Sequence, residues 1–243
     1  MTERGQIQYG SSTITYTVNR SNRRKKTIEI TLDGHAGVLV AAPEATPAED
    51  IAAIINKRAK WIVRKTPLSG LDLHPRRFVS GETLPYMGRQ VRMHIDEAND
   101  VGKALVSFRH WHFEVLVPVG LEGPARHDAI RRAFLRWYGA RATERLREKV
   151  RRWSRLLGLQ PTDLLIRDQR QRWASCAPDG TLRFNWRVIM AEAALIDYVV
   201  LHELAHLSVK GHSAEFWALV ASVMPDYASR RKRLREVGPY LSL

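Results

Sequence analysis

The sequence predicts an α+β fold, in which a β-rich N-terminal subdomain with one helix precedes a half built from helices and a small antiparallel sheet. Three observations support this prediction. Segments of alternating apolar and polar residues fill much of the first half of the 243-residue chain. Apolar residues then recur at helical spacing over residues 125–157. A second apolar, helix-compatible stretch follows near residue 200. We therefore expect two domains, residues 1–122 and 123–243.

In the first half, residues 6–42 alternate in the manner of strands. A helix should then begin after Thr46, because threonine suits an N-cap and Pro47 the first turn. More strands are expected at Arg77–Val79, Val91–Ile95, Leu105–Phe108 and Phe113–Val117. The segment Leu84–Gly88 has the composition of a tight connection between two of them.

The second half should open with a long helical pattern over residues 125–157, which is either continuous or broken near Gly139. Strands are then predicted at Leu164–Arg167, Arg172–Cys176 and Thr181–Trp186, the last two joined by a turn at Pro178–Gly180. Ser213 is a suitable N-cap for another helix, which should end at Met224-Pro225. A basic tail, Arg230–Arg235, is expected to follow.

The strongest chemical signal is the order H-E-x-x-H formed by His202, Glu203 and His206. On a helix, residues four apart lie on one face, so the two imidazoles can bind the same metal ion. Glu203 flanks them and can act as general base toward a water on the metal. The alternative is a helix with two structural histidines and a solvated glutamate. It is disfavoured because each buried imidazole would need its own polar partner.

His212 is the candidate third ligand, because a catalytic zinc ion takes three protein ligands and keeps one open position. Lys210-Gly211 predicts a helix stop that lets the chain fold back and present His212 to the pair. The spacing from His202 to His212 equals that of metzincins, but Val209 stands where their motif has glycine. The chain is therefore not assigned to the metzincins.

Three other side chains are candidates for the chemistry. Arg172 could stabilise a developing oxyanion, or it could form a structural ion pair in the hairpin. Asn185 could orient a neighbouring group. Cys176 is more consistent with a buried structural thiol than with a nucleophile or metal ligand, because no other cysteine accompanies it.

The net charge of +14 and the sequence pI near 10.4 suggest an anionic partner, such as nucleic acid, nucleotide phosphates or an acidic surface. The alternative is that the arginines only solvate the surface. With a single cysteine, no internal disulfide framework can form. The sequence has no apolar run of membrane-spanning length, so we expect a soluble cytoplasmic protein.

Several segments carry a family resemblance. In the second half they are Arg172–Cys176, Leu182–Arg187, Asp197–His206, His212–Trp217 and Met224–Tyr227. In the first half they are Lys26–Ile28, Ala42-Pro43, Lys60–Ile62 and Leu84–Arg89. Together they resemble the YgjP-like metallopeptidase family, a relative of the SprT-like and WLM zincins. One departure is Ala174, where the family usually has glycine.

The resemblance implies a zincin-like catalytic half with a zinc ion held by His202, His206 and His212. It also implies a metallopeptidase that uses a zinc-bound water and the general base Glu203. Two alternatives stay open, because some family members are regarded as nucleoside triphosphate pyrophosphatases acting on UTP, and SprT-like relatives act on DNA-bound proteins. The expected substrate is accordingly a peptide or a nucleotide.

Overall fold

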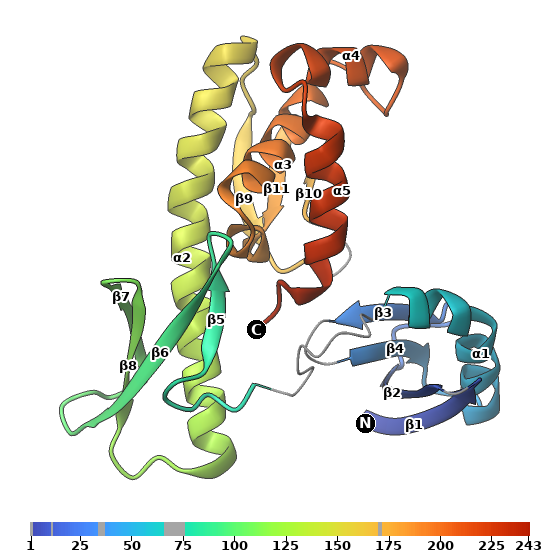
Figure 1. Ribbon diagram of the computed structural model, residues 1–243, viewed down its shortest axis with the longest axis vertical. Helices are drawn as coiled ribbons and strands as arrows, with labels where there is room; N and C mark the ends of the chain where they lie inside the picture. Colours follow the sequence, from blue (N-terminus) through green and yellow to red (C-terminus); the bar gives the residue numbers. More distant parts are fainter. Residues whose placement is uncertain (1, 11, 34–36, 66–75, 170–171) are drawn as a thin grey trace. The chain divides into compact units, whose positions relative to one another are not determined.

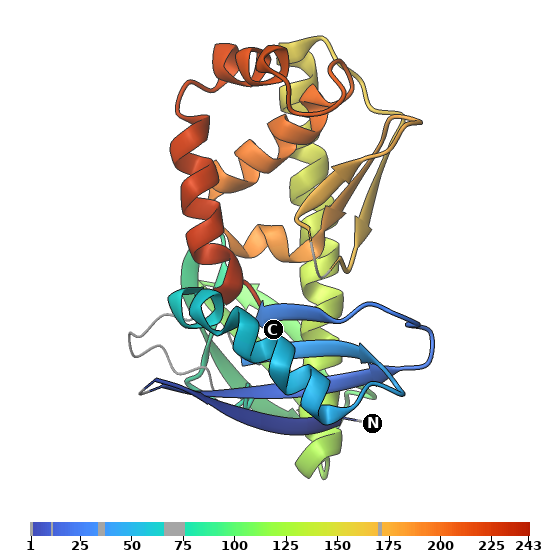
Figure 2. The ribbon, with the colours of Figure 1, turned by 90° about the vertical axis from the view of Figure 1, so that its right-hand side faces the viewer.

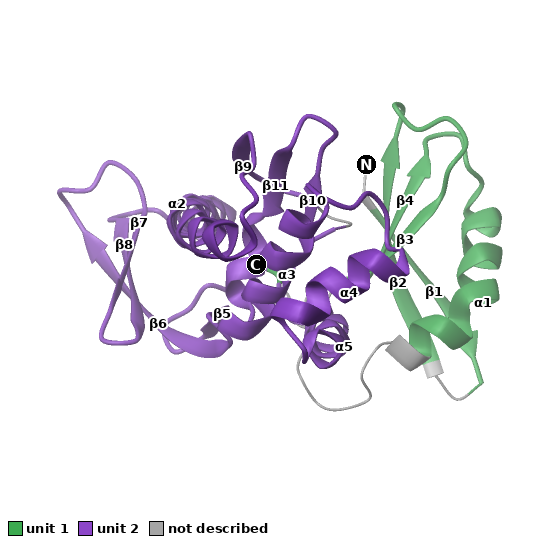
Figure 3. Cartoon of the chain, turned by 90° about the horizontal axis from the view of Figure 1, so that it is seen from above, with its two compact units in different colours: residues 1–76, 242 green, residues 77–241, 243 purple. Residues whose placement is uncertain are grey.

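The computed structural model describes residues 2–10, 12–33, 37–65, 76–169 and 172–243. It combines helices with three separate sheets, which confirms the predicted α+β class (Figure 1). The chain forms two compact units, Met1–Arg76 with Ser242 and Arg77–Leu241 with Leu243 (Figure 3). Each unit is described by itself below.

The first unit is a four-stranded sheet with one helix. Its elements are β1 (Thr2–Tyr9), β2 (Ser12–Ser21), β3 (Glu29–Asp33), β4 (Gly37–Pro43) and α1 (Ala48–Lys65). The strand order is β1-β2-β4-β3, with β2 parallel to β4 and the other neighbours antiparallel. Apolar residues of β2, β4 and α1 form a core of their own, which includes Val40, Ile51 and Ile55. The predicted strands and helix of this region are confirmed.

The second unit begins with another four-stranded sheet. Its strands are β5 (Thr83–Tyr86), β6 (Arg89–Ala98), β7 (Leu105–Arg109) and β8 (His112–Pro118), in the order β5-β6-β8-β7. Its buried face packs on helix α2 (Gly123–Leu157) through aromatic rings, with Phe113 and Trp137 only 4.9 Å apart between centroids. The Tyr138 hydroxyl donates a hydrogen bond to the Pro85 carbonyl at 2.7 Å. The expected boundary after residue 122 therefore falls inside this unit.

Two predictions in this sheet are corrected. Arg77–Val79 is not a strand, because Phe78 has a left-handed φ of 50° and the Val79 N–H donates to the Glu82 carboxylate at 3.4 Å. The predicted connection Leu84–Gly88 is shorter than expected. Its first three residues belong to β5, and only Met87-Gly88 forms the turn into β6.

Helix α2 runs without interruption through Gly139, so of the two alternatives the continuous helix is the one observed. Phe134, Tyr138 and Ala142 are buried on either side of the glycine, and this burial holds the helix together despite the low helix propensity of glycine. The helix ends where Gly158 adopts a left-handed φ of 68°.

The rest of the second unit surrounds one apolar helix. Its elements are β9 (Asp163–Arg167), β10 (Ala174–Cys176), β11 (Thr181–Asn185), the 3-10 helix Trp186–Met190, α3 (Ala193–Ala205), α4 (Ala214–Val223), α5 (Tyr227–Val237) and the 3-10 helix Gly238–Tyr240. Figure 2 shows α3 between the three-stranded sheet and α5. Among the described residues, no helix combines the length and the apolar character needed to cross a bilayer.

Two details differ from the prediction here. The small sheet, in the order β10-β11-β9, is mixed: β10 and β11 are antiparallel, whereas β9 and β11 are parallel. Residues 230–235 are not a tail but lie within α5, where the buried Leu234 holds the helix against the core.

Replacement of two glycines by alanine should have opposite effects on stability. A Cβ at Gly88, whose φ is 78°, would lie 2.5 Å from Cγ of Glu192 and 2.9 Å from its Cα. Gly88→Ala should therefore lower the free energy of unfolding by about 1–3 kcal/mol. A Cβ at Gly139 would meet nothing within 4 Å, so Gly139→Ala should raise it by about 0.5–1 kcal/mol. Urea denaturation measures both, and equal effects would contradict the prediction.

Candidate metal centre

Helix α3 presents His202 and His206 on one face. The helix ends at Ala205, about one turn before the predicted stop, and His206 is its C-cap. Its φ of −68° and ψ of −14° remain helical, so the two imidazoles keep the four-residue spacing of one helix face. Their ring centroids are 4.9 Å apart.

The turn after α3 returns His212 to this pair. Gly211 has a left-handed φ of 79°, the conformation that the sequence suggested for it. The Ser213 hydroxyl then accepts a hydrogen bond from the Phe216 N–H at 3.3 Å and begins α4, as predicted. One ring nitrogen from each of His202, His206 and His212 lies within 4.8 Å of the other two.

These nitrogens suit a metal ion. The Nε2 atoms of His202 and His212 are 2.9 Å apart. Two nitrogens on one tetrahedral zinc ion are roughly 3.3 Å apart, so a small outward shift would admit the ion. Nδ1 of His206 lies 3.2 Å from the Val209 carbonyl, to which it can donate while Nε2 binds metal. Nδ1 of His202 is buried without a hydrogen-bond partner in the described part of the chain.

The electrostatics favour neutral imidazoles, the form in which histidine binds metals. Burial, with smaller contributions from the neighbouring imidazoles and Arg231, lowers the pKa of His202 to about 3. Burial likewise lowers the pKa of His206. The lone pairs of both rings are therefore free for a cation at neutral pH.

Glu203 follows His202 on α3 but is not among the residues whose ligand atoms converge on the metal position. Its side chain is buried, and this burial raises the pKa of its carboxyl to about 7. A hydrogen bond from the Cys176 N–H and the positive charge of Arg172 oppose that rise. A carboxylate with a pKa in this range can both accept and release a proton near neutral pH.

The remaining sequence candidates lie on β10, on β11 and in the loop before β10. Arg172 is exposed and close enough to act on Glu203, and within the described ranges no ion pair holds it. The amide of Asn185 donates to the carbonyls of Gln169 at 2.6 Å and Arg172 at 3.3 Å, so it fixes the loop that carries Arg172. Burial raises the pKa of the Cys176 thiol, which suits a structural role.

Asp197 anchors the metal helix to α2. Its Oδ1 accepts hydrogen bonds from Lys149 Nζ at 2.7 Å and from the Trp153 indole at 2.9 Å. Both charged side chains of this pair are only 15% exposed. Because Asp197 lies five residues before His202 on the same helix, the pair holds the histidines in place relative to the core.

Aromatic rings that the sequence did not single out surround the histidines. Phe216 stacks on His206 with centroids 4.4 Å apart, and Trp217 stacks on His212 at 5.5 Å. Tyr198 lies 5.8 Å from His202. The N-cap Ser213 could have predicted these contacts. It places Phe216 and Trp217 in the first turn of a helix that begins directly after the third histidine.

Trp217→Leu should weaken metal binding, because His212 lies in an exposed turn and loses the ring that fixes its plane. We expect the zinc affinity to fall about 10-fold, which is the low end of the range for substitutions of residues that contact metal ligands. Competition with a chromogenic chelator measures this. Trp111→Leu is the matched control, because Trp111 is 54% exposed and lies in the turn between β7 and β8. Equal affinities of the two variants would contradict the prediction.

Comparison with known proteins assigns the chain to a family. The family model described as YgjP-like, metallopeptidase domain, matches residues 26–237. Two solved metallopeptidase zymogens each match 37% of this chain with a TM-score of 0.34. Abylysin of Pyrococcus abyssi is 26% identical over 90% of its chain, and jannalysin of Methanocaldococcus jannaschii is 21% identical over 92%. No curated protein matches the chain.

Proposed function

Because the chain belongs to the YgjP-like metallopeptidase family, we propose that it is a zinc-dependent peptidase in which Glu203 is the general base. The observation that carries this proposal is the convergence of three histidine nitrogens within 4.8 Å, with a buried glutamate that directly follows His202 on the same helix. Two histidines and a glutamate of this spacing, with a third histidine, form the minimal apparatus of a zinc hydrolase.

The residues have distinct tasks. His202, His206 and His212 would hold a zinc ion, which would supply Lewis-acid chemistry at that position. Glu203 accepts the proton of the attacking water and passes it to the leaving amine. Its raised pKa suits both steps, because the carboxyl group holds the proton only transiently. Arg172, on the β10 side of Glu203, adds a fixed positive charge for the developing oxyanion.

Strand β10 offers a place for an extended peptide. It is an edge strand, which pairs with β11 on one side only in the described sheet. Trp173 and Ala177 form backbone hydrogen bonds to β11. Because these bonds alternate along an antiparallel pair, the backbone N–H and C=O groups of Ala174 and Cys176 point toward the open edge. The Cys176 N–H is used by Glu203. The backbone groups of Ala174 are left for a substrate strand beside the general base.

A nucleoside triphosphate is the second candidate substrate. The observation that favours it is positive charge on two sides of the metal position, from Arg172 near Glu203 and from Arg231 near His202. Against it, the three histidines are the only group of metal-binding side chains in the described part of the chain. A second divalent ion on the phosphates would need carboxylates of its own.

Turnover of zinc-loaded protein on a peptide library and, in parallel, on UTP tests the two candidates. The peptidase proposal predicts new peptide ends and no pyrophosphate release. Pyrophosphate release without peptide cleavage would instead support the nucleotide candidate. Zinc-free protein is the control in both assays, and activity that persists there would exclude the metal mechanism.

A further inference from the structure

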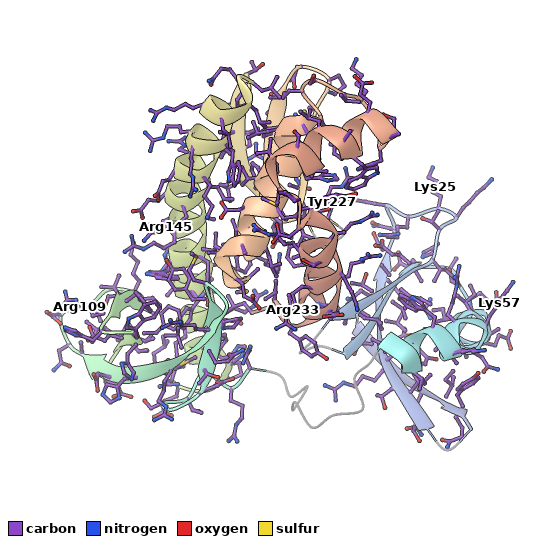
Figure 4. All side chains as sticks on the ribbon, turned by 45° about the horizontal axis from the view of Figure 1, so that its top comes forward. Lys25, Lys57, Arg109, Arg145, Tyr227 and Arg233 are labelled. Atoms are coloured by element: carbon purple, nitrogen blue, oxygen red, sulfur yellow. The ribbon has the colours of Figure 1, made fainter. Side chains whose placement is uncertain are left out.

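Helix α5 is the most basic element beside the metal centre. Its cationic residues are Arg230, Arg231, Lys232, Arg233 and Arg235. Two of them have acidic partners within the second unit, because Arg230 pairs with Asp226 at 2.8 Å and Arg233 pairs with Glu192 at 3.2 Å. These two guanidinium groups serve the fold. Figure 4 shows Arg233 on α5, and Tyr227 at the start of that helix.

Arg231 and Arg235 differ from them. They are four residues apart and so share one face of α5, where like charges repel. Both are exposed, and neither pairs with a carboxylate anywhere in the described ranges. The side-chain hydrogen bond between them runs from Arg235 Nε to the Arg231 carbonyl at 3.4 Å. Beyond that bond, these two adjacent guanidinium groups without an acid present nine N–H donors to a ligand.

These two arginines adjoin the metal centre. The Arg231 guanidinium lies 4.8 Å from the centre of the Trp217 ring, and Trp217 stacks on the metal-binding candidate His212. Arg235 follows Arg231 by one turn on the same face of α5, and α5 packs against α3, the helix that carries His202. The pair therefore borders the histidines from α5, whereas β10 borders α3 on its other side (Figure 2).

We propose that Arg231 and Arg235 form a subsite for a carboxylate of the substrate, so that the enzyme prefers peptides with an acidic side chain near the scissile bond. The inference rests on the peptidase function proposed above. A carboxylate would relieve the repulsion between the two guanidinium groups and accept paired hydrogen bonds from their planar forks. The Trp217 ring under Arg231 fixes one fork in place, so less side-chain entropy is lost on binding.

The surroundings favour a carboxylate over a phosphate chain. A polyphosphate usually brings a divalent ion, which needs oxygen ligands from carboxylates. The described residues hold a single metal-binding group, and it consists of three histidines. A carboxylate needs no such ion, and two arginines at the edge of the site satisfy it.

Binding of paired peptides to the zinc-loaded Glu203→Gln protein tests the proposal, because this variant should bind without cleavage. The probes are labelled, end-capped peptides that carry either Glu or Gln at each position in turn, and fluorescence anisotropy measures their affinities. We expect at least one position where Glu binds about 10-fold more tightly than Gln. The added double change Arg231→Gln/Arg235→Gln should reduce that preference to less than about twofold.

Arg233→Gln is the matched control. It removes one charge from the same helix, but residue 233 is two positions from both Arg231 and Arg235 and therefore faces another side of α5, so this variant should keep the preference. Equal binding of Glu and Gln peptides, or equal loss in the control, would overturn the subsite. Tighter, arginine-dependent binding of UTP would reassign it to phosphate and also overturn it. Glu-selective binding without cleavage by the wild-type protein would support the subsite while counting against the proposed hydrolysis.

Discussion

Glu203→Gln should abolish peptide turnover and leave the metal in place. We expect kcat to fall about 100- to 10,000-fold, the range that a general base usually contributes. The amide of glutamine has nearly the shape of the carboxylate but cannot accept a proton at neutral pH. Glu203 is not one of the residues whose ligand atoms converge on the metal position, so the variant should keep one zinc ion per chain. Atomic absorption measures this zinc content.

The surroundings of Glu203 explain why the effect should be so large. The side chain is only 7% exposed, so no nearby bulk water can replace it as proton acceptor. Its partners, the Cys176 N–H and the Arg172 charge, hold the carboxylate in one place. Glu215→Gln is the matched control, because Glu215 is an exposed acid in the first turn of α4. Full turnover by Glu203→Gln would falsify the general-base assignment.

Local geometry explains which parts of the site could be predicted from the sequence. The side-by-side placement of His202 and His206 follows from helix periodicity alone. The left-handed turn at Gly211 and the N-cap Ser213 depend on one residue and its neighbours in sequence. These local signals together were enough to expect His212 near the pair.

Tertiary contacts explain what the sequence did not reveal. Arg231 meets the site only because α5 packs against α3, and the predicted tail gave no reason to expect a helix there. Gly139 is a second case. The sequence shows the low helix propensity of glycine, but it does not show that the burial of neighbouring side chains overrides this propensity. Phe78 differs from these two cases, because the contact is local. The Glu82 carboxylate accepts a hydrogen bond from the Val79 N–H, next to a left-handed backbone at Phe78 that an apolar pattern cannot indicate.

His212→Ala should lose the metal without losing the fold. We expect the zinc affinity to fall by more than about 100-fold, because even changes to residues around a ligand cost 10- to 100-fold. The ring nitrogen of His212 is 2.9 Å from that of His202, and the described residues offer no other group that converges there. His212 is exposed, so its truncation leaves no cavity in the core.

Thermal unfolding with and without chelator separates metal loss from misfolding. Metal that binds only the folded state raises the unfolding temperature, so a chelator should lower the Tm of the wild-type protein. The Tm of His212→Ala should match that of the chelated wild-type protein and should not respond to chelator. His94→Ala, at an exposed histidine on β6, is the control and should behave as wild type. If His212→Ala keeps a chelator-sensitive Tm and one zinc ion per chain, a residue other than His212 is the third ligand.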